Sequence, residues 1–192
     1  MADPTEAATA RQTEILDAAI GVFLRYGFRK TSMDDLARAA GISRQGLYLH
    51  FPTKEALFKA MVTHTIGVMR ADARAAFARE DLELEARVLG AFEAMFSKGI
   101  GSENLDDLIA TTSQLVGSVA CTLEDTFVAD LTRVLRAAGI AARWKEAGIS
   151  VKDLAEHLFA TSVGIKHQAK SLDEYRERMR VAVRLVCRSA PQ

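Results

Sequence analysis

The chain has 192 residues, of which 49% are hydrophobic and 26% are charged, a balance typical of a soluble globular protein and not of a disordered chain. It contains only 3 prolines and few β-branched clusters, which favours an all-helical fold because proline interrupts helices. The sequence has neither a long apolar run nor an apolar leader near its acidic N-terminus, so we expect a cytoplasmic protein without a membrane span.

The distribution of charge is more informative than its sum. The formal net charge is +0, yet the segment from Arg25 to Lys54 holds six basic residues against two aspartates. A local basic excess inside a neutral chain indicates a DNA-binding module attached to a second domain, although a solvated charged face would have the same composition. Cys121 and Cys187 lie in apolar helical stretches, where we expect reduced, buried thiols.

The first predicted helix covers residues 10–26, after a flexible N-terminal arm over residues 1–9. Its apolar residues recur at helical spacing and form one face. Thr9 and Gln12 are spaced as in a capping box, which would place the helix start at Ala10. Gly27 follows the last apolar position, where a residue with positive φ commonly ends a helix.

A helix-turn-helix is predicted next. A second helix begins near Thr31, with a hydroxyl cap followed by acidic residues that suit the positive end of a helix dipole. Gly41 then supplies a tight turn, Ile42 plugs the core, and Ser43 caps a third helix that extends to Phe51. A small residue, a glycine, an apolar residue and a cap at these offsets are typical of a helix-turn-helix.

The third helix carries the candidate DNA contacts. Leu47 and Phe51 are one turn apart and should face the core, which leaves the other side chains outward or at the margins. In the first turn of this helix, an arginine can pair with guanine and a glutamine with adenine in the major groove. The glycine that follows has no side chain, so the backbone there can come close to the DNA. Tyrosine and histidine can donate to phosphates, and a lysine at the next helix start can clamp one. These residues are Arg44, Gln45, Gly46, Tyr48, His50 and Lys54.

The stretch from Tyr26 to Phe58 closely resembles the DNA-binding domain of the TetR (tetracycline repressor) family. Its Ala-Ala-Gly-Ile-Ser, Leu-Tyr-x-His-Phe and Thr-Lys-Glu-x-Leu-Phe elements all fall in register. The resemblance implies a phosphate contact at Thr31 or Ser32, base and phosphate contacts from the third helix, and a phosphate-binding lysine at Lys54. Leu49 departs from the aromatic residue that some members have there, and no contact is assigned to it.

The remaining sequence, residues 55–192, predicts a larger helical domain. A long helix starts at Lys54, and further helices are expected near 82–97, 105–112, 115–138, 151–169 and 172–189. Glycines near 99–101 and the segment 139–150 divide them. The predicted architecture is therefore all-α, with a helix-turn-helix domain over residues 10–54 and a helical-bundle domain after it.

Two properties of this domain follow from the resemblance. It implies a homodimer through the last two helices, where apolar stripes run through Leu154, Leu158, Ser162, Tyr175, Met179, Ala182, Leu185 and Val186, although such stripes would also fit a monomer core. It also implies a pocket for an effector, for which candidate lining residues are Phe92, Phe96, Phe127, Trp144, His157 and His167; phenylalanines at this spacing are more often plain core.

The leading hypothesis is a ligand-responsive transcriptional regulator, most simply a repressor that a small apolar or aromatic molecule releases from a palindromic operator. Its partners would be double-stranded DNA, a second copy of the chain and that effector. No metal-ligand spacing, nucleophile set or phosphate loop is visible, so we expect no cofactor, metal or enzymatic activity. A helical enzyme or ligand carrier, and an architectural protein tethered to DNA, are the alternatives.

Overall fold

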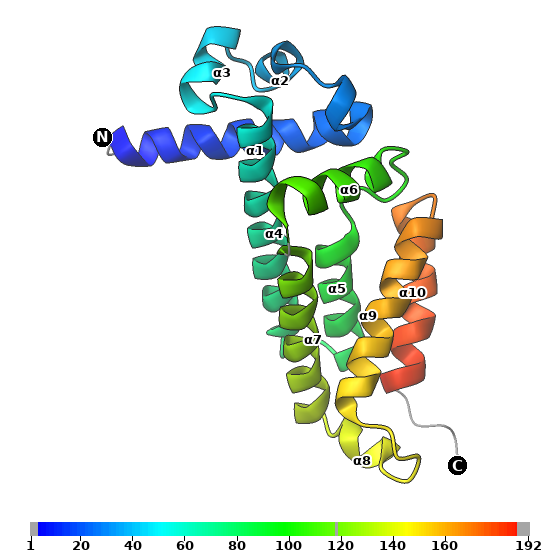
Figure 1. Ribbon diagram of the computed structural model, residues 1–192. Coiled ribbons are helices and arrows are strands. Elements are labelled where there is room, and N and C mark those ends of the chain that lie inside the picture. Colours follow the sequence, from blue (N-terminus) through cyan, green and yellow to red (C-terminus); the bar gives the residue numbers. More distant parts are fainter. Residues whose placement is uncertain (1–3, 118, 188–192) are drawn as a thin grey trace. The chain divides into compact units, whose positions relative to one another are not determined.

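The computed structural model describes residues 4–117 and 119–187, and all their regular elements are α-helices (Figure 1). This confirms the predicted all-α class. The helices are α1 (Pro4–Lys30), α2 (Met33–Ala39), α3 (Arg44–His50), α4 (Lys54–Phe77), α5 (Leu84–Phe96), α6 (Leu105–Val116), α7 (Val119–Ala137), α8 (Ile140–Trp144), α9 (Val151–Gln168) and α10 (Leu172–Cys187).

The chain forms two compact units. The first contains residues up to Val68 together with 102–119, and the second contains 69–101 and 120 onward. The sequence placed the domain boundary at residue 54 and assigned everything after it to the second domain. The structure differs because the first half of α4 and all of α6 pack in the N-terminal unit.

The first helix starts earlier than predicted. Pro4 is its first residue, a position where proline is favoured because its missing N–H is not needed. The expected flexible arm is therefore wrong for residues 4–9, and residues 1–3 lie outside the described part. Thr9 lies inside α1 and cannot cap its start. Gly27 has φ 76° and kinks the helix where the sequence predicted its end.

The helix-turn-helix is confirmed in its local detail. Ser32 caps α2 and forms a capping box with Asp35, one residue later than the predicted start at Thr31. Gly41 has φ 64°, as the tight turn requires, and the Ile42 amide donates to the Ala37 carbonyl at 3.0 Å. Ser43 then accepts a hydrogen bond from the Gly46 amide at 3.0 Å and so caps α3.

An aromatic cluster fixes the N-terminal unit. Phe58 on α4 meets Phe23 on α1 at a ring-centroid distance of 5.1 Å and Phe28 at 5.0 Å, both edge to face. Leu47 of α3 is fully buried in the same core. The outward side of α3 is therefore set by packing on its inward side.

The start of α6 caps the end of α1. Ser102 Oγ donates to the Leu24 carbonyl at 2.7 Å, and Asn104 Nδ2 donates to the Arg25 carbonyl at 2.9 Å. The Phe28 amide donates to Asp107 Oδ2 at 3.3 Å. The first two bonds satisfy carbonyl groups at the helix kink, and the third satisfies the Phe28 amide there.

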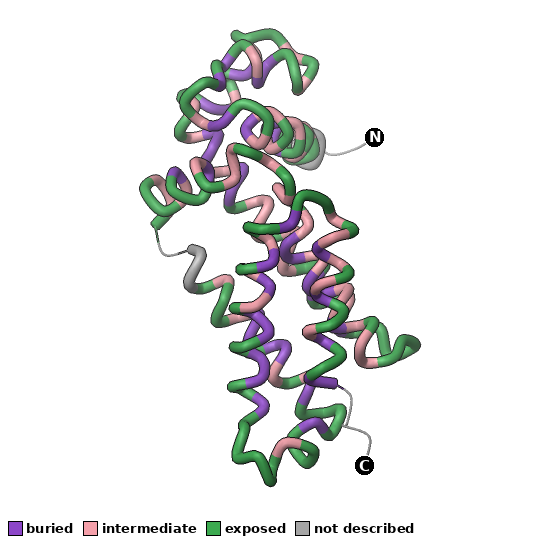
Figure 2. The backbone as a smooth tube through the Cα atoms, turned by 90° about the vertical axis from the view of Figure 1, so that its right-hand side faces the viewer, coloured by how far each residue is buried: buried purple, intermediate pink, exposed green. Residues whose placement is uncertain are grey.

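The second unit is a bundle in which α10 packs on α5 and α9, and α5 packs on α9. Figure 2 shows the buried positions recurring as stripes along these helices. One buried polar bridge crosses the core: Tyr175 Oη lies 2.7 Å from Ser162 Oγ and donates to the Phe92 carbonyl at 3.4 Å. The five-residue helix α8 lies in the segment that the sequence had assigned to a connection.

Cys187 is a buried free thiol, as expected, and burial raises its pKa to about 11. Since the thiolate is the reactive form, both the burial and the raised pKa of Cys187 disfavour reaction of this thiol at neutral pH. The side chain of Cys121 lies outside the described residues.

Candidate nucleic-acid interface and effector domain

The short helix α3 presents a mixed polar and apolar face to solvent. Its Leu47 and the following Phe51 are buried, whereas Leu49 is 84% exposed and Tyr48 is 40% exposed. Arg44 and Gln45 are exposed in the first turn, and Gly46 and His50 are half-buried at the margins. The predicted outward residues of the recognition helix are thus accessible, and Leu49 lies among them although the sequence assigned it no contact.

Arg44 is held in place before any DNA is bound. Its guanidinium lies 3.1 Å from Asp34 Oδ2 of α2 and 5.7 Å from the centre of the Tyr48 ring. A hydrogen bond with Tyr48 and the charge of Asp34 raise the pKa of Arg44 above its already high ordinary value. All three side chains are on the surface, so the pair orients the arginine more than it stabilises the fold.

The two residues that the resemblance offered as a phosphate contact, Thr31 and Ser32, differ in their exposure at the start of α2. Thr31 is buried, and its hydroxyl donates to the Gly27 carbonyl at 2.7 Å, so the expected contact from Thr31 is not available in this conformation. Ser32 is exposed. Its hydroxyl accepts from the Asp35 amide and donates to Asp35 Oδ2 at 2.6 Å, which lowers the pKa of that carboxyl.

Lys54 also differs from the expectation that it clamps a phosphate. Its Nζ donates to the carbonyls of Phe28 at 2.8 Å and Thr31 at 2.9 Å, and it lies 4.4 Å from the centre of the Phe28 ring. Two of the three ammonium protons therefore bind the last turn of α1 and Thr31 just after it. In this conformation Lys54 has a structural role, because it links the start of α4 to the end of α1 and to Thr31.

Sequence reasoning missed three residues that lie on α3 or beside it. Leu49 follows buried Leu47 by two positions, a signal that it faces outward and was readable from the sequence. Asp34 carried no signal, because its pairing with Arg44 depends on the crossing of α2 and α3. Arg11, on α1, donates to the Ala40 carbonyl beside the turn at 3.4 Å, a contact across 29 residues that no local pattern indicates.

The predicted pocket residues divide into three groups. Phe92, Phe96 and Phe127 are buried and packed together with Phe77 and Phe159, with ring-centroid distances between 4.9 and 6.3 Å. None of the described pockets is lined by these rings. In the conformation seen, the phenylalanines fill the core of the second unit.

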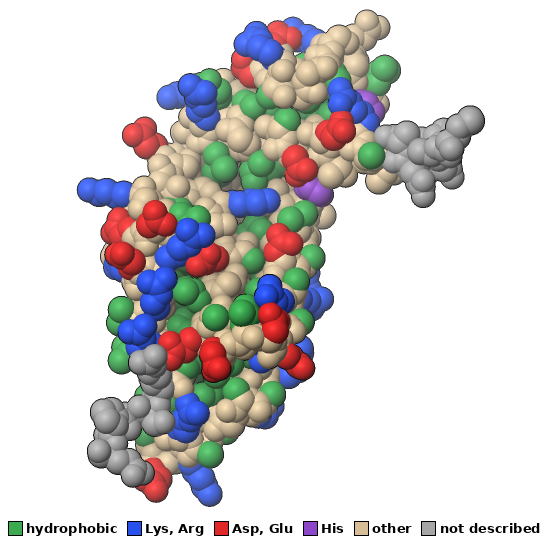
Figure 3. Space-filling view, turned by 180° about the vertical axis from the view of Figure 1, so that it is seen from behind, with side chains coloured by type: hydrophobic (Ala, Val, Ile, Leu, Met, Phe, Trp, Pro, Cys, Tyr) green, Lys and Arg blue, Asp and Glu red, His purple; other side chains and the backbone are tan. Residues whose placement is uncertain are grey.

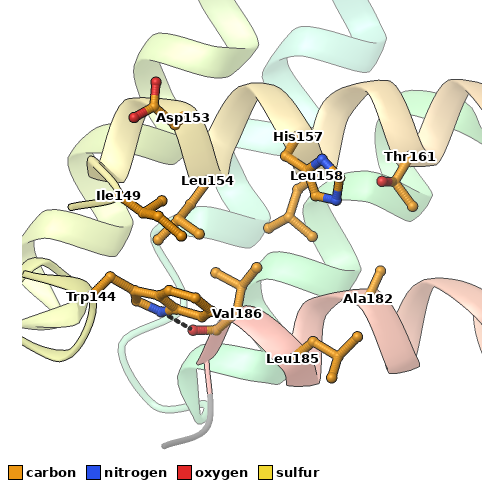
Figure 4. A pocket seen from close by; sticks show the side chains of 10 residues that line it. All are labelled: Trp144, Ile149, Asp153, Leu154, His157, Leu158, Thr161, Ala182, Leu185 and Val186. Atoms are coloured by element: carbon orange, nitrogen blue, oxygen red, sulfur yellow. Dashed lines mark hydrogen bonds between the residues drawn. The ribbon is translucent and has the colours of Figure 1, made fainter. Parts of the chain in front are cut away.

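Trp144 and His157 instead line an open surface pocket of about 550 Å³ between α8, α9 and α10 (Figure 4). The pocket is mostly apolar, and Trp144 Nε1 donates to the Val186 carbonyl at 3.3 Å at one end of it. The exposed side chain of His167 lies near the end of α9 and does not line this pocket.

The predicted dimer stripes are largely wrong. Ser162, Tyr175 and Met179 are fully buried within one subunit, and Leu154, Leu158 and Val186 are at most 5% exposed. These residues form the core between α5, α9 and α10. Only Leu185, which is 70% exposed, and half-buried Ala182 remain accessible from that set, and neighbouring Val181 is 59% exposed.

On the face drawn in Figure 3, acidic and basic side chains are interspersed with apolar ones. Among residues 4–117 and 119–187 there is no group of three metal-ligating side chains, and no helix there is long and apolar enough to cross a membrane.

The N-terminal unit is similar in sequence to known bacterial regulators. The model of the family described as "Bacterial regulatory proteins, tetR family" matches residues 15–61. The HTH-type transcriptional regulator RutR of Escherichia coli K12 is 35% identical over 71 residues, 37% of this chain and 34% of that protein. The HTH-type transcriptional repressor KstR2 of Rhodococcus jostii is 45% identical over 56 residues, 29% of this chain and 28% of that protein. The matches thus span about a third or less of these relatives.

Solved structures extend the likeness of fold to the whole chain. A TetR transcriptional regulator from Legionella pneumophila aligns with a TM-score of 0.69 and 20% identity, covering 96% of this chain and 97% of that one. The regulator PfmR from Thermus thermophilus aligns with a TM-score of 0.61 and 21% identity over 93% of this chain and 99% of that one. Taken together with the helix-turn-helix geometry of α2 and α3, these matches show that residues 15–61 form a DNA-binding domain of the TetR-family type and that the chain as a whole has the fold of the solved TetR-family regulators.

Proposed function

We propose that this protein is a ligand-responsive, sequence-specific DNA-binding transcriptional regulator that acts as a homodimer, most simply as a repressor. The observation that carries the proposal is α3: a capped helix locked by buried Leu47, with Arg44, Gln45 and Leu49 exposed. A helix held in this way enters the major groove with its first turn against the base edges.

The test is a selection of genomic fragments by the purified protein at moderate salt. A regulator enriches a limited set of fragments that share a palindromic sequence, because two half-sites are read by two copies of α3. A protein that merely tethers to DNA would retain all fragments equally and lose them together as salt rises. Uniform retention would contradict the proposal.

The homodimer is proposed through the outward side of α10 and the adjoining part of α9. Val181 and Leu185 are one helical turn apart and exposed, and Leu185 also lines the apolar pocket of Figure 4. Exposed apolar residues that gather on one face favour an association site. Gly164 and Ala160 on α9 are small and exposed, which permits close approach of a second copy.

Light scattering combined with gel filtration tests this interface. Leu185→Asp should give monomers, because it places a charge in an apolar contact without disturbing the subunit core. Ala75→Asp is the matched control, since Ala75 is exposed on helix α4. If both variants elute as the wild type does, the interface lies elsewhere.

The effector is proposed to be a small apolar or aromatic molecule that enters the second unit. The phenylalanine cluster from α4, α5, α7 and α9 lies buried there, and Lys166 lies at its edge, with Nζ 5.6 Å from the centre of the Phe96 ring. A ligand would have to separate these rings, and the rearrangement would be coupled to α3 by a free energy of about 1–3 kcal/mol.

Release of the selected operator fragment by a library of aromatic and aliphatic compounds tests ligand response. A true effector lowers operator affinity by the same factor by which the operator lowers effector affinity, because binding linkage is reciprocal. The single tryptophan, Trp144, gives a fluorescence signal from the second unit in the same titration. Operator binding that no compound alters would favour the architectural alternative.

A further inference from the structure

We propose that Leu49 contacts the C5 methyl group of a thymine in the major groove and thereby fixes a T·A pair at one position of each half-site. The inference rests on the proposed DNA-binding function and deepens it, by assigning the apolar part of the readout to a residue for which neither the motif nor the charge pattern gave a role.

The position of Leu49 on α3 is the first observation. Successive helical residues are about 100° apart, so Leu49 points about 200° away from buried Leu47. Leu49 is therefore opposite the core, and its 84% exposure is the largest of the exposed apolar side chains described. Gln45 lies one turn before it on the same side, and Arg44 and Tyr48 lie toward one margin.

The surroundings of Leu49 give the second observation. Gly46, three positions earlier, has no side chain, so the leucine stands beside a bare stretch of backbone. Arg44 is drawn to the margin by Asp34 and Tyr48, at the distances given above, and so leaves the centre of the face to Gln45 and Leu49. The centre of the face thus combines one amide that can form a bidentate contact with one apolar group.

The chemistry of the groove selects thymine as the partner. Its C5 methyl is the largest apolar group that a base pair offers in the major groove, whereas the N7, O6, N6, O4 and N4 positions are hydrogen-bond donors and acceptors. A leucine placed against those groups would exclude water from them without replacing their hydrogen bonds, which is unfavourable. Leu49 therefore attracts a T·A pair and disfavours the alternatives.

The experiment uses the full-length protein and the operator recovered by genomic selection. Each thymine is replaced in turn by deoxyuridine, which lacks only the C5 methyl group. At one thymine per half-site the replacement should weaken wild-type binding about four-fold, the effect of leaving one methyl group uncovered. Leu49→Ala should bind the thymine and deoxyuridine operators equally at that position.

Arg44→Ala is the matched control. It removes another side chain of the same helix face, and it should keep the four-fold preference for thymine at the position that Leu49 reads, because the two contacts concern different bases. Circular dichroism of Leu49→Ala should match the wild type, since a side chain so exposed contributes little to the fold.

Several results would overturn the inference. One is a wild type that binds every deoxyuridine operator as it binds thymine; another is a Leu49→Ala variant that keeps the full preference. If Leu49→Ala alters self-association and leaves DNA affinity unchanged, Leu49 is a protein contact and the inference fails while the proposed function stands. If the wild type shows no preference for any DNA sequence, both the inference about Leu49 and the proposed function fail.

Discussion

Asp34 on α2 and Arg44 on α3 form an ion pair of 3.1 Å on the face that is proposed to meet DNA. The pair places a carboxylate at a surface where phosphates would approach. It holds the guanidinium in one orientation, and it also repels the polyanion. Asp34 therefore has two opposing effects on binding, one on base selection and one on overall affinity.

Removal of this carboxylate should separate the two effects. Asp34→Asn is expected to bind random DNA about five-fold more tightly at low salt, since one charge interaction near the surface is worth about 1 kcal/mol. Preference for the operator over random DNA should fall, because Arg44 loses its orienting partner. Fluorescence anisotropy with both DNAs measures the two quantities. Asp125→Asn, an exposed change in the second unit, is the control; unchanged binding of random DNA by Asp34→Asn would contradict this reasoning.

Lys54 provides a second prediction, in which a structural role is distinguished from a phosphate contact. Lys54→Met should lower the free energy of unfolding by about 2–4 kcal/mol, because two charge-assisted hydrogen bonds are lost together. Urea denaturation measures this, and Lys59→Met, an exposed change on the same helix, should lie within about 0.5 kcal/mol of the wild type. A Lys54→Met protein of normal stability that binds all DNA weakly would instead assign the lysine to a phosphate.

The sequence predicted the helix-turn-helix well because its signals are local. The caps at Ser32 and Ser43 and the positive φ at Gly41 each depend on a few neighbouring residues. The inward direction of Leu47 is likewise decided within one turn of helix. Such features need no knowledge of the distant chain, and they position the exposed residues of α3 automatically.

The second unit was predicted less well for a physical reason. An apolar stripe such as the one through Leu158, Ser162 and Met179 indicates which side of a helix is covered, and it carries no information on what covers it. Here the cover is the same subunit, so the residues expected between two copies lie in the core. The phenylalanines expected around a cavity fill the core for the same reason.

Contacts between residues far apart in the chain could not be predicted from the sequence. The hydrogen bond from Asn104 to the Arg25 carbonyl joins residues that are 79 positions apart, and it brings α6 into the N-terminal unit. Neither residue belongs to a motif that would predict the pairing. The position of Gly27 was predictable as a helix end, whereas the partner that approaches it was not.

Gly27 can be tested by substitution, with Gly21 on the same helix as the matched control. A Cβ at Gly27 would lie 3.1 Å from Asn104 Oδ1 and 3.2 Å from Asp107 Oδ2, at a φ of +76°, whereas nothing lies within 4 Å of a Cβ at Gly21. Gly27→Ala should therefore destabilise the protein by about 1–3 kcal/mol. Gly21→Ala should stabilise it by about 0.5–1 kcal/mol, because alanine favours the helix interior.

Thermal and urea unfolding measure both glycine variants. The change in the free energy of unfolding should be negative for Gly27→Ala and positive for Gly21→Ala. Both variants add the same methyl group, so a general effect of that group cancels in the comparison. Equal destabilisation by the two variants would show that crowding around α1, and not the backbone conformation at Gly27, decides the outcome.

Lys166 gives the last prediction, which concerns pH. It is half-buried beside Phe96, and desolvation lowers the pKa of its ammonium from 10.5 to about 8. Below pH 8 both folded and unfolded chains carry the proton, so the folded state bears the full penalty of the desolvated charge. Between about 8 and 10.5 the folded chain has released the proton while the unfolded chain keeps it, and this contribution to stability rises with pH.

Lys166→Met should consequently be more stable than the wild type at pH 7, by about 1–2 kcal/mol, because an apolar side chain of similar length suits the same site. The advantage should shrink as the pH rises from about 8 to 10.5, where the wild type escapes the penalty. Urea unfolding at intervals of pH, read as the difference between variant and wild type, cancels the titration of all other groups. Lys152→Met, which removes an exposed positive charge from the same helix, is the control; a Lys166→Met difference that does not vary with pH over this range would mean that the folded chain leaves the Lys166 ammonium fully hydrated.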